Sequence, residues 1–385
     1  MFAALRIPYE PVRWVRDNTT DAEIEAAKPA KIAELVHSYR SRGHLMADTD
    51  PLAYRQRKHG DLDIQNHGMT LWDLDRTFPT GGFGGRTKST LRDILGLLRD
   101  SYCRTVGVEY MHLRPHAAQV APGAPRVRVR AHAREDQLRI LRRLNSAEAF
   151  ETFLQTKFVG QKRFSLEGGE ALIPLLDAIL SKAARTASTR SASAWRTAGG
   201  STCSPTSRAR ATRRFREFEG NLDPKSVQGS GDVKYHLGTE GVFTAETGAT
   251  TKVYLAANPS TSEAVDPVLE GIVRAKQDRI DLGGDGFSVL PILIHGDAAF
   301  AGQGSCPRCS TSRSCAVPHR RHRARHHQQP GRLHHGPSSS RSTTYATDVA
   351  KGYQVPIFHV NGTTPRRACA SPSSPSRSAS SSTAT

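Results

Sequence analysis

The sequence has few aromatic residues and no long apolar run. Phe, Trp and Tyr make up 6% of the 385 residues and hydrophobic residues 37%, which is low for a large enzyme and indicates that part of the chain cannot be buried. No run approaches the roughly 20 apolar residues that span a bilayer, and residues 1–11 lack the apolar core of a signal peptide. We therefore expect a cytoplasmic protein that has no membrane partner.

Four segments, which we call the arginine windows, contain no Lys, Asp or Glu. They span residues 114–134, 185–214, 305–336 and 363–385 and hold 22 arginines, so subtracting these charges from the formal net charge of +18 leaves the rest of the chain at −4. The windows also hold five of the six cysteines. A high net charge ordinarily indicates a nucleic-acid partner. Here the charge belongs to four segments, so we expect no nucleic-acid binding by the protein as a whole.

Outside the windows, the apolar pattern is typical of a folded α/β protein. Apolar spacing predicts helices over Lys28–Arg42, Leu91–Tyr102 and Asp136–Phe158. Aliphatic runs at Lys252–Ala257 and Val289–Ile294 predict buried strands. Strands that alternate with helices favour a mainly parallel sheet. Inside the windows, neither the helical nor the strand spacing of apolar residues lasts for more than a few residues. We therefore expect irregular structure there.

Five blocks outside the windows carry recognisable motifs. In chain order they are YRSRGHLMADTDPL (Tyr39–Leu52), KFVGQKRFSLEGGEALIPLLDAI (Lys157–Ile179), GSGDVKYHLG (Gly229–Gly238), HGDAAFAGQG (His295–Gly304) and PIFHVNG (Pro356–Gly362). These blocks, in this order, resemble the decarboxylating component of 2-oxoglutarate dehydrogenase, including the multifunctional 2-oxoglutarate metabolism enzymes.

The resemblance implies an α/β thiamine-diphosphate-binding fold with a mainly parallel sheet, preceded by N-terminal helices. We expect an N-terminal helical region over residues 1–113 and an irregular window over 114–134. A diphosphate-binding domain would follow over 135–362, and the windows 185–214 and 305–336 would interrupt it. A disordered tail would occupy 363–385.

The windows conceal the family's missing motifs in a neighbouring reading frame. Ala194–Thr206 (AWRTAGGSTCSPT) can be encoded by a string that gives MAHRGRLNVLAN when read two nucleotides later. Gln328–Pro337 (QQPGRLHHGP) similarly gives NNQVGFTTA one nucleotide later, and Thr363–Arg367 conceals DDPEA. Codon degeneracy leaves freedom in each choice. Agreement at three places where the family predicts the hidden text indicates out-of-frame translation.

The block that follows the apolar run at Val289–Ile294 resembles the start of the family's thiamine diphosphate motif. By this resemblance, Asp297 would coordinate Mg²⁺, and Ala298 and Ala299 would lie against the cofactor. Oxygen ligands suit Mg²⁺, which shares its coordination shell with phosphate oxygens. A lone Gly-Asp after a strand is more often a simple turn, so this assignment depends on the neighbouring FAGQG.

Other site residues are implied by the same resemblance. His236 resembles a histidine that contacts the substrate, and Phe164 a residue that lines the same pocket. Within NPSTSEAVDP, Ser260 matches a substrate contact, while Thr261 and Ser262 stand where the family has His and Leu. We include Ser262 among the cofactor-binding residues. A lone histidine is usually a surface or core residue, and only the flanking VKY and LG favour a role for His236.

Two losses predict that this chain is inactive. The family's HRG, which supplies a pocket histidine and a cofactor-binding arginine, is replaced near Arg196 and Thr197. The asparagine that serves as the second metal ligand is replaced within Gln328–His335. The family's glutamate that activates the thiamine ring lies on a later domain.

The resemblance implies oxidative decarboxylation of 2-oxoglutarate, with succinyl transfer to lipoamide or release of succinate semialdehyde. It implies thiamine diphosphate and Mg²⁺ as cofactors, a lipoamide-bearing acyltransferase as partner, and a homodimer.

Two alternatives remain open at this point. Cys306, Cys309 and Cys315, followed by several histidines, have spacing that suits a zinc site. The windows could instead be disordered linkers, or belong to a non-catalytic basic protein that binds nucleic acid or phosphates.

Overall fold

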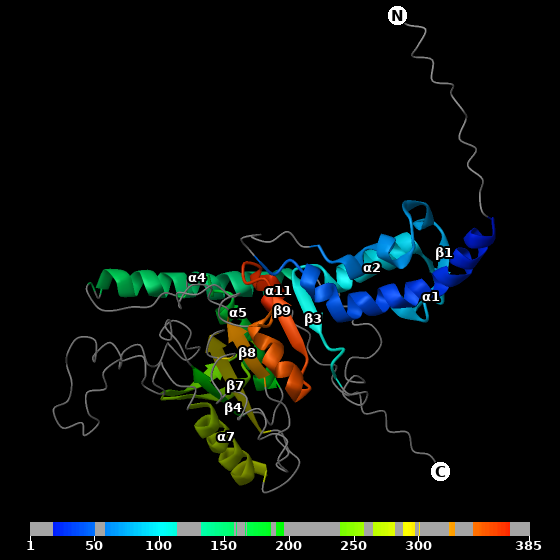
Figure 1. Cartoon of the computed structure of the whole chain (residues 1–385). Helices are drawn as coiled ribbons and strands as arrows, with labels where there is room; N and C mark the ends of the chain where they lie inside the picture. Colours follow the sequence, from blue (N-terminus) through cyan, green and yellow to red (C-terminus); the bar gives the residue numbers. More distant parts are fainter. Residues whose placement is uncertain are drawn as a thin grey trace, which may run out of the picture.

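The computed structural model describes residues 18–50, 58–113, 132–157, 168–185, 190–195, 239–257, 265–281, 288–296, 323–327 and 342–369, together with residues 159, 166 and 300. We call residues 18–113 the N-terminal region, the elements from 172 to 327 the sheet region, and residues 342–369 the C-terminal segment (Figure 1). Among the described helices, none combines the length and the apolar character needed to cross a membrane.

Two helices form the body of the N-terminal region. Helix α1 (Asn18–Arg42) buries residues at helical spacing, and helix α2 (Leu91–Tyr102) packs beside it. Thr90 begins α2, because its hydroxyl accepts a hydrogen bond from the Asp93 amide at 3.2 Å. The predicted helix Leu91–Tyr102 is confirmed, and the helix predicted over Lys28–Arg42 begins ten residues earlier, at Asn18. The buried face of α1 consists of Ile32, Leu35, Val36 and Tyr39.

Two short strands and several 3₁₀ helices are among the other described elements of this region. Strand β1 (Thr77–Pro79) pairs antiparallel with β2 (Lys88–Thr90). Among the described residues, short 3₁₀ helices connect the longer elements: η2 (Gly43–Met46), η3 (Gly60–Leu62), η4 (Ile64–His67), η5 (Leu71–Asp73) and η6 (Phe83–Gly85).

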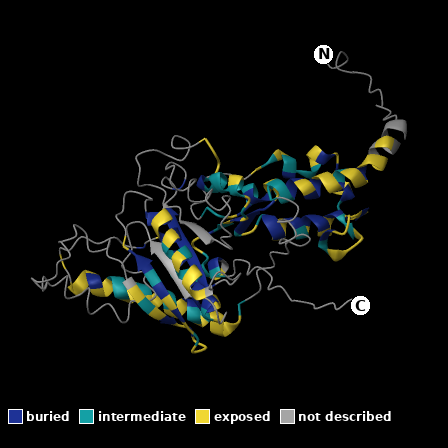
Figure 2. Cartoon of the chain, turned by 90° about the horizontal axis from the view of Figure 1, so that it is seen from below, coloured by how far each residue is buried: buried dark blue, intermediate teal, exposed yellow. Residues whose placement is uncertain are grey.

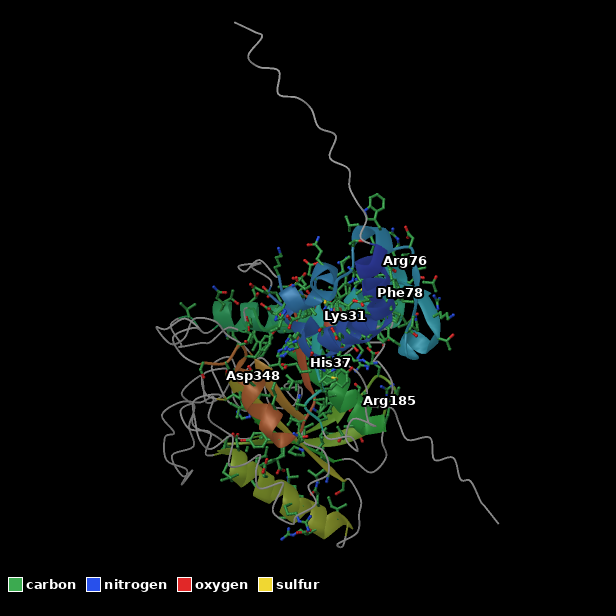
Figure 3. The ribbon with its side chains drawn as sticks, turned by 45° about the vertical axis from the view of Figure 1, so that its right-hand side comes forward. Lys31, His37, Arg76, Phe78, Arg185 and Asp348 are labelled. Atoms are coloured by element: carbon green, nitrogen blue, oxygen red, sulfur yellow. The ribbon has the colours of Figure 1, made fainter. Side chains whose placement is uncertain are left out.

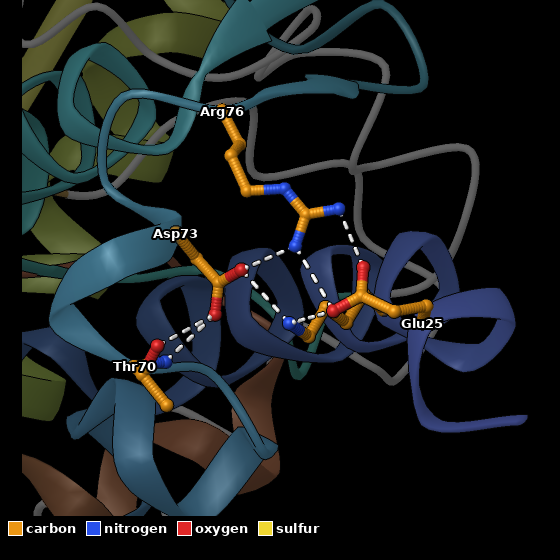
Figure 4. Close-up of polar contacts among 5 residues, drawn as sticks. Glu25, Thr70, Asp73 and Arg76 are labelled. Carbon is orange, nitrogen blue, oxygen red and sulfur yellow. Dashed lines mark hydrogen bonds and ion pairs between the residues drawn. The ribbon is translucent and has the colours of Figure 1, made fainter. Parts of the chain in front are cut away.

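An ion network around the buried Lys28 and Asp73 ties α1 to η5 (Figure 4). Asp73 Oδ1 lies 2.8 Å from both Lys28 Nζ and Arg76 Nη1, and its Oδ2 accepts the Thr70 amide at 2.9 Å. Burial alone would raise the pKa of Asp73, but the hydrogen bonds from Lys28, Thr70 and Arg76 lower it to about 2. Glu25 completes the network through both cations.

The C-terminal segment docks on the N-terminal region by strand pairing. Strand β3 (Val106–Glu109) pairs antiparallel with β9 (Ile357–Val360), so that Glu109 stands opposite Ile357. Helix η8 (Ala346–Tyr353) precedes β9, and the short helix α11 (Pro365–Cys369) follows it and contacts α5. Segments about 250 residues apart in the sequence are thereby held side by side.

In the described residues, the sheet region contains five strands in the order β5-β6-β4-β7-β8. Strand β4 (Arg190–Trp195) is central and pairs parallel with β6 (Thr250–Ala256) and with β7 (Val289–Gly296). Strand β8 (Arg323–His327) pairs parallel with β7, and β5 (Thr239–Thr244) pairs antiparallel with β6.

Helices cover both faces of this sheet. Along β7, Leu290, Ile292 and Ile294 pack against α5 (Leu172–Arg185), whereas Val289 and Leu293 pack against α7 (Val265–Asp281). Figure 1 shows α5 and α7 on opposite sides of the strands, and Figure 2 shows stripes of buried and exposed residues along the helices. Burial on both faces explains why β7 is an unbroken apolar run.

Helix α4 (Arg134–Lys157) lies beside α5. Arg139 Nε donates to Asp177 Oδ2 at 2.7 Å, which joins the two helices through a charge-assisted hydrogen bond. Among the described residues of α4, only Ile140 and Leu154 are buried apolar side chains, while Leu141 and Phe153 are exposed.

The structure confirms the mixed α/β class with N-terminal helices. The expectation that the windows are irregular is wrong for residues 190–195 and 323–327, which are strands, and for 365–369, which are helical. Sheet hydrogen bonds join backbone groups that every residue except proline carries in full. A segment that lacks an apolar period can therefore still occupy a place between two strands. The domain boundaries and the thiamine-diphosphate-binding fold stay predictions.

Candidate functional site

The carboxyl ends of three parallel strands meet at one edge of the sheet. Ala194 of β4 stands opposite Ala256 of β6 on one side and Leu293 of β7 on the other. The four parallel strands occur as β4, β6, β7 and β8 in sequence, but as β6-β4-β7-β8 in space. The direction of progression therefore reverses between β4 and β7. Open α/β sheets bind ligands beyond the carboxyl ends of their strands at such a switch point.

A buried histidine and carboxylate lie at this edge. His295 Nδ1, near the end of β7, is 3.8 Å from Asp266 Oδ2 in the first turn of α7. Both side chains are buried, and the Phe300 ring lies 5.3 Å from the His295 ring, between centroids. The N-terminal end of a helix favours a negative charge, which suits Asp266. The two residues come from NPSTSEAVDP and HGDAAFAGQG, so these motifs meet in the fold.

All seven predicted site residues lie outside the described residues. The described chain stops one residue before Asp297, where β7 ends at Gly296, and resumes at Phe300. The structure therefore neither gathers nor separates these residues, and their roles stay predictions. The seven are Phe164, His236, Ser260, Ser262, Asp297, Ala298 and Ala299. The cysteines of the zinc alternative, Cys306, Cys309 and Cys315, also lie outside the described residues.

A second polar cluster lies where β3 pairs with β9, and sequence reasoning missed it. Glu109 Oε1 is 2.6 Å from His359 Nε2, and Glu109 Oε2 is 3.3 Å from His44 Nε2. Lys351 Nζ lies 2.6 Å from Glu109 Oε2 and 2.7 Å from Asp348 Oδ1. Asp348, labelled in Figure 3, belongs to the orange η8 element.

Burial and hydrogen bonding set the charges in this cluster. Burial would raise the pKa of Glu109, but hydrogen bonds from His359 and Lys351 lower it to about 2. Burial lowers the pKa of His44 to about 4, although Glu109 opposes this shift. Burial would also lower the pKa of Lys351, but Asp348 and Glu109 raise it. At neutral pH the cluster therefore combines an ionised carboxylate, an ammonium and a neutral imidazole at His44.

A signal for the cluster was present in the sequence. His44 lies in YRSRGHLMADTDPL, and His359 lies in PIFHVNG. Both histidines therefore occur in blocks that carry the family resemblance. Glu109 had no comparable signal, because a Glu at the end of a short apolar run is common on protein surfaces.

No family model matches the chain. Among the similar proteins, the multifunctional 2-oxoglutarate metabolism enzyme of Mycolicibacterium vanbaalenii is 48% identical over 383 residues, which is 95% of this chain. The corresponding enzyme of Mycobacterium sp. (strain JLS) is 46% identical over 96% of the chain. The 2-oxoglutarate dehydrogenase E1/E2 component of Corynebacterium glutamicum is 43% identical over 95% of the chain.

The chain is homologous to a segment of these 2-oxoglutarate enzymes. It spans 30% of the length of each of the three relatives. The homologous segment includes most of the arginine windows, because the alignment leaves out only 5% of the chain.

Proposed function

We propose that this chain is the diphosphate-binding segment of a thiamine-diphosphate-dependent enzyme that decarboxylates 2-oxoglutarate, and that it is inactive as translated. The switch point between β4 and β7 carries the proposal. Asp297 follows β7 in the sequence, and the hidden MAHRG text begins at Ala194, near the end of β4. The predicted metal ligand and the missing arginine would thus flank the same switch point.

Contact between the NPSTSEAVDP and HGDAAFAGQG motifs also supports a site at the switch point between β4 and β7. Asp266 and His295 are 3.8 Å apart. Ser260 precedes Asp266 by six residues, and Asp297 follows His295 by two. A pocket of ordinary size at this edge could therefore hold both the substrate contact and the metal ligand.

The donor set does not fit thiamine diphosphate and Mg²⁺ in its present form. Asp297 offers one hard oxygen ligand, but the chain reads Arg196 and Thr197 in place of the expected His and Arg. Gln328–His335 likewise replaces the expected asparagine. A Mg²⁺ ion that shares its shell with phosphates is held by one or two protein ligands and by the phosphates themselves, so this chain keeps one expected ligand and lacks the second ligand and the phosphate-binding arginine.

The alignment supports out-of-frame translation. An independent basic insertion would interrupt the match to relatives, but the alignment covers 95% of the 385-residue chain. A shifted reading frame changes residue types and preserves length. The central place of β4 in the sheet also disfavours a separate nucleic-acid-binding tail, because residues 190–195 are part of the fold.

For the intact parent enzyme we propose thiamine diphosphate and Mg²⁺ as cofactors and 2-oxoglutarate as substrate. A lipoamide-bearing acyltransferase as partner, a homodimer and a cytoplasmic location belong to the same proposal. The name of the Corynebacterium glutamicum relative, an E1/E2 component, favours a link between decarboxylation and acyl transfer.

Resequencing the encoding DNA across the four windows tests the proposal. We expect compensating insertions or deletions at the window boundaries, and a corrected reading that contains MAHRG and NNQVGF. An unbroken frame, confirmed by mass spectrometry of the windows in the expressed protein, would contradict it. Purified protein with the present sequence should not decarboxylate 2-oxoglutarate above the background of cofactor alone.

A further inference from the structure

Two imidazoles and one carboxylate converge at the junction of the N-terminal region and the C-terminal segment. The ligand atoms of His44, Glu109 and His359 all lie within 4.8 Å of one another. We propose that these three residues bind a divalent transition-metal ion of the zinc type. None of these three residues is a predicted Mg²⁺ or thiamine diphosphate ligand, so the proposal stands or falls independently of the proposed function.

The three donors suit such an ion. Imidazole nitrogen and carboxylate oxygen are ordinary zinc ligands, and three protein ligands leave a fourth position for water. In a tetrahedral site with bonds near 2.1 Å, neighbouring ligand atoms are roughly 3.4 Å apart. His44 Nε2 and Glu109 Oε2 already lie 3.3 Å apart. The other ligand pairs lie within 4.8 Å of one another, so they need to move by at most roughly 1.4 Å to reach that spacing.

Packing fixes both imidazole rings before any ion binds. The Tyr345 ring stacks on His359, with centroids 3.9 Å apart and an interplanar angle of 25°. The Tyr345 hydroxyl also donates to the backbone oxygen of His44 at 3.3 Å. Gly107 lets His44 approach β3, because a Cβ atom at that position would lie 3.0 Å from His44 Cβ. Held rings lose little freedom when they bind a metal.

Lys351 shows that the site attracts a cation. Its ammonium contacts both Glu109 and Asp348, so it neutralises the carboxylate that an ion would use. The Lys351 side chain is 38% exposed, whereas those of the three ligands are 9% exposed or less. A long flexible lysine can swing into solvent and keep its charge hydrated. Lys351 would therefore compete with the metal for the Glu109 carboxylate. When a metal binds, the Lys351 ammonium would move out toward solvent.

This competition separates a metal site from a purely structural ion cluster. In a structural cluster, Lys351→Met only destabilises the fold, because it leaves Glu109 with one fewer cation. In a metal site, the same change removes the competitor and raises metal affinity. Glu109→Gln has the opposite effect on affinity, since an amide is a poor zinc ligand.

The test is Zn²⁺ and Co²⁺ titration of the full chain after chelator treatment. The background carries Cys306→Ser, Cys309→Ser and Cys315→Ser, so that window thiols do not bind the metal. Stoichiometry is read by competition with a chromophoric chelator, and Co²⁺ geometry by visible absorption. Circular dichroism checks the fold of each variant.

We expect Glu109→Gln to bind one metal equivalent fewer, or to bind that equivalent at least about a hundredfold more weakly. Lys351→Met should bind the same equivalent more tightly, by about tenfold or more. His37→Asn, which changes an exposed histidine of α1 (Figure 3), should leave both quantities unchanged.

Equal stoichiometry and affinity in the background protein and in both site variants would overturn the proposal. If Glu109→Gln fails to fold, Lys351→Met decides alone. A folded Lys351→Met variant with unchanged or weaker metal binding would then show that the cluster is only a structural ion network.

Discussion

The N-terminal region and the sheet region differ in the interactions that hold their elements in place. In the described residues, the N-terminal region has one cluster of 16 buried apolar side chains, whereas the sheet region has three clusters of seven, six and four. The N-terminal region lies wholly outside the windows, but the central strand of the sheet lies inside one. Side chains specify the first region, while backbone pairing between neighbours holds β4 in the second.

The largest expected effect tests the ion network around the buried Asp73 of the N-terminal region. Asp73→Asn leaves Lys28 and Arg76 without the buried carboxylate that both contact, and should cost about 3–5 kcal/mol in the free energy of unfolding. Asp75→Asn is the matched control, because Asp75 and Arg92 form an exposed pair; it should cost less than about 1 kcal/mol. Urea denaturation measures both. Equal effects would mean that the network adds nothing beyond a surface ion pair.

Core truncations compare the two regions directly. Leu98 and Leu269 are both fully buried, and Leu→Ala substitutions in protein cores cost about 2–5 kcal/mol. We expect Leu98→Ala to fall near the upper end, because it lies in the largest cluster, and Leu269→Ala near the lower end. Hydrogen exchange of each region would report the two losses separately. The reverse order would contradict the comparison.

Acid should weaken the N-terminal region in two stages. Burial lowers the folded pKa of His44 from 6.5 to about 4, so the unfolded state binds more protons, and stability falls as pH drops from about 6.5 to 4. The folded pKa values of Asp73 and Glu109 are also lowered, to about 2. Their contribution is complete above the unfolded values near 4 and is lost as pH falls toward 2.

Thermal unfolding from pH 7 to pH 3, followed by circular dichroism, measures this trend. His44→Gln should remove the first stage and keep the second. Stability that is constant or rising between pH 6.5 and 4 would show that His44 is not buried in its neutral form.

The smallest expected effect concerns the close approach of η2 to β3. In Gly107→Ala the new methyl group would lie 3.0 Å from His44 Cβ and 3.2 Å from Ala47 Cβ, at a cost of about 1–3 kcal/mol. Gly96→Ala is the control, since nothing lies within 4 Å of a Cβ atom at this helical position; it should stabilise the protein by about 0.5–1 kcal/mol. Equal shifts in urea midpoint would argue against the tight contact.

Side-chain periodicity explains which elements could be predicted. Helix α2 has the predicted bounds, Leu91–Tyr102. The strand predicted at Val289–Ile294 is two residues longer and ends at Gly296. Strands β4 and β8 could not be predicted, because their order depends on pairing with distant strands and their own sequences contain no run of large apolar residues. The pairing of β3 with β9 was hidden for a similar reason, since it joins residues about 250 positions apart.

The candidate site could likewise be predicted only in part from the sequence. The end of β7 and its parallel neighbours could be anticipated from one apolar run and the HGD that follows it. The contact between Asp266 and His295 required the fold, because α7 separates the two residues in sequence. His44, Glu109 and His359 come from three distant segments, and spacing along the chain carries no information about such a meeting.

Cofactor binding by two forms of the chain tests the central claim most directly. Isothermal titration with thiamine diphosphate at millimolar Mg²⁺ would compare the present chain with one re-coded to read the windows in the neighbouring frame. The present chain lacks two charge-assisted contacts, each worth about 1.5–3 kcal/mol. We therefore predict binding at least roughly a hundredfold weaker than in the re-coded chain. Micromolar affinity in the present chain, equal to that of the re-coded one, would contradict the claim that the windows have lost the site.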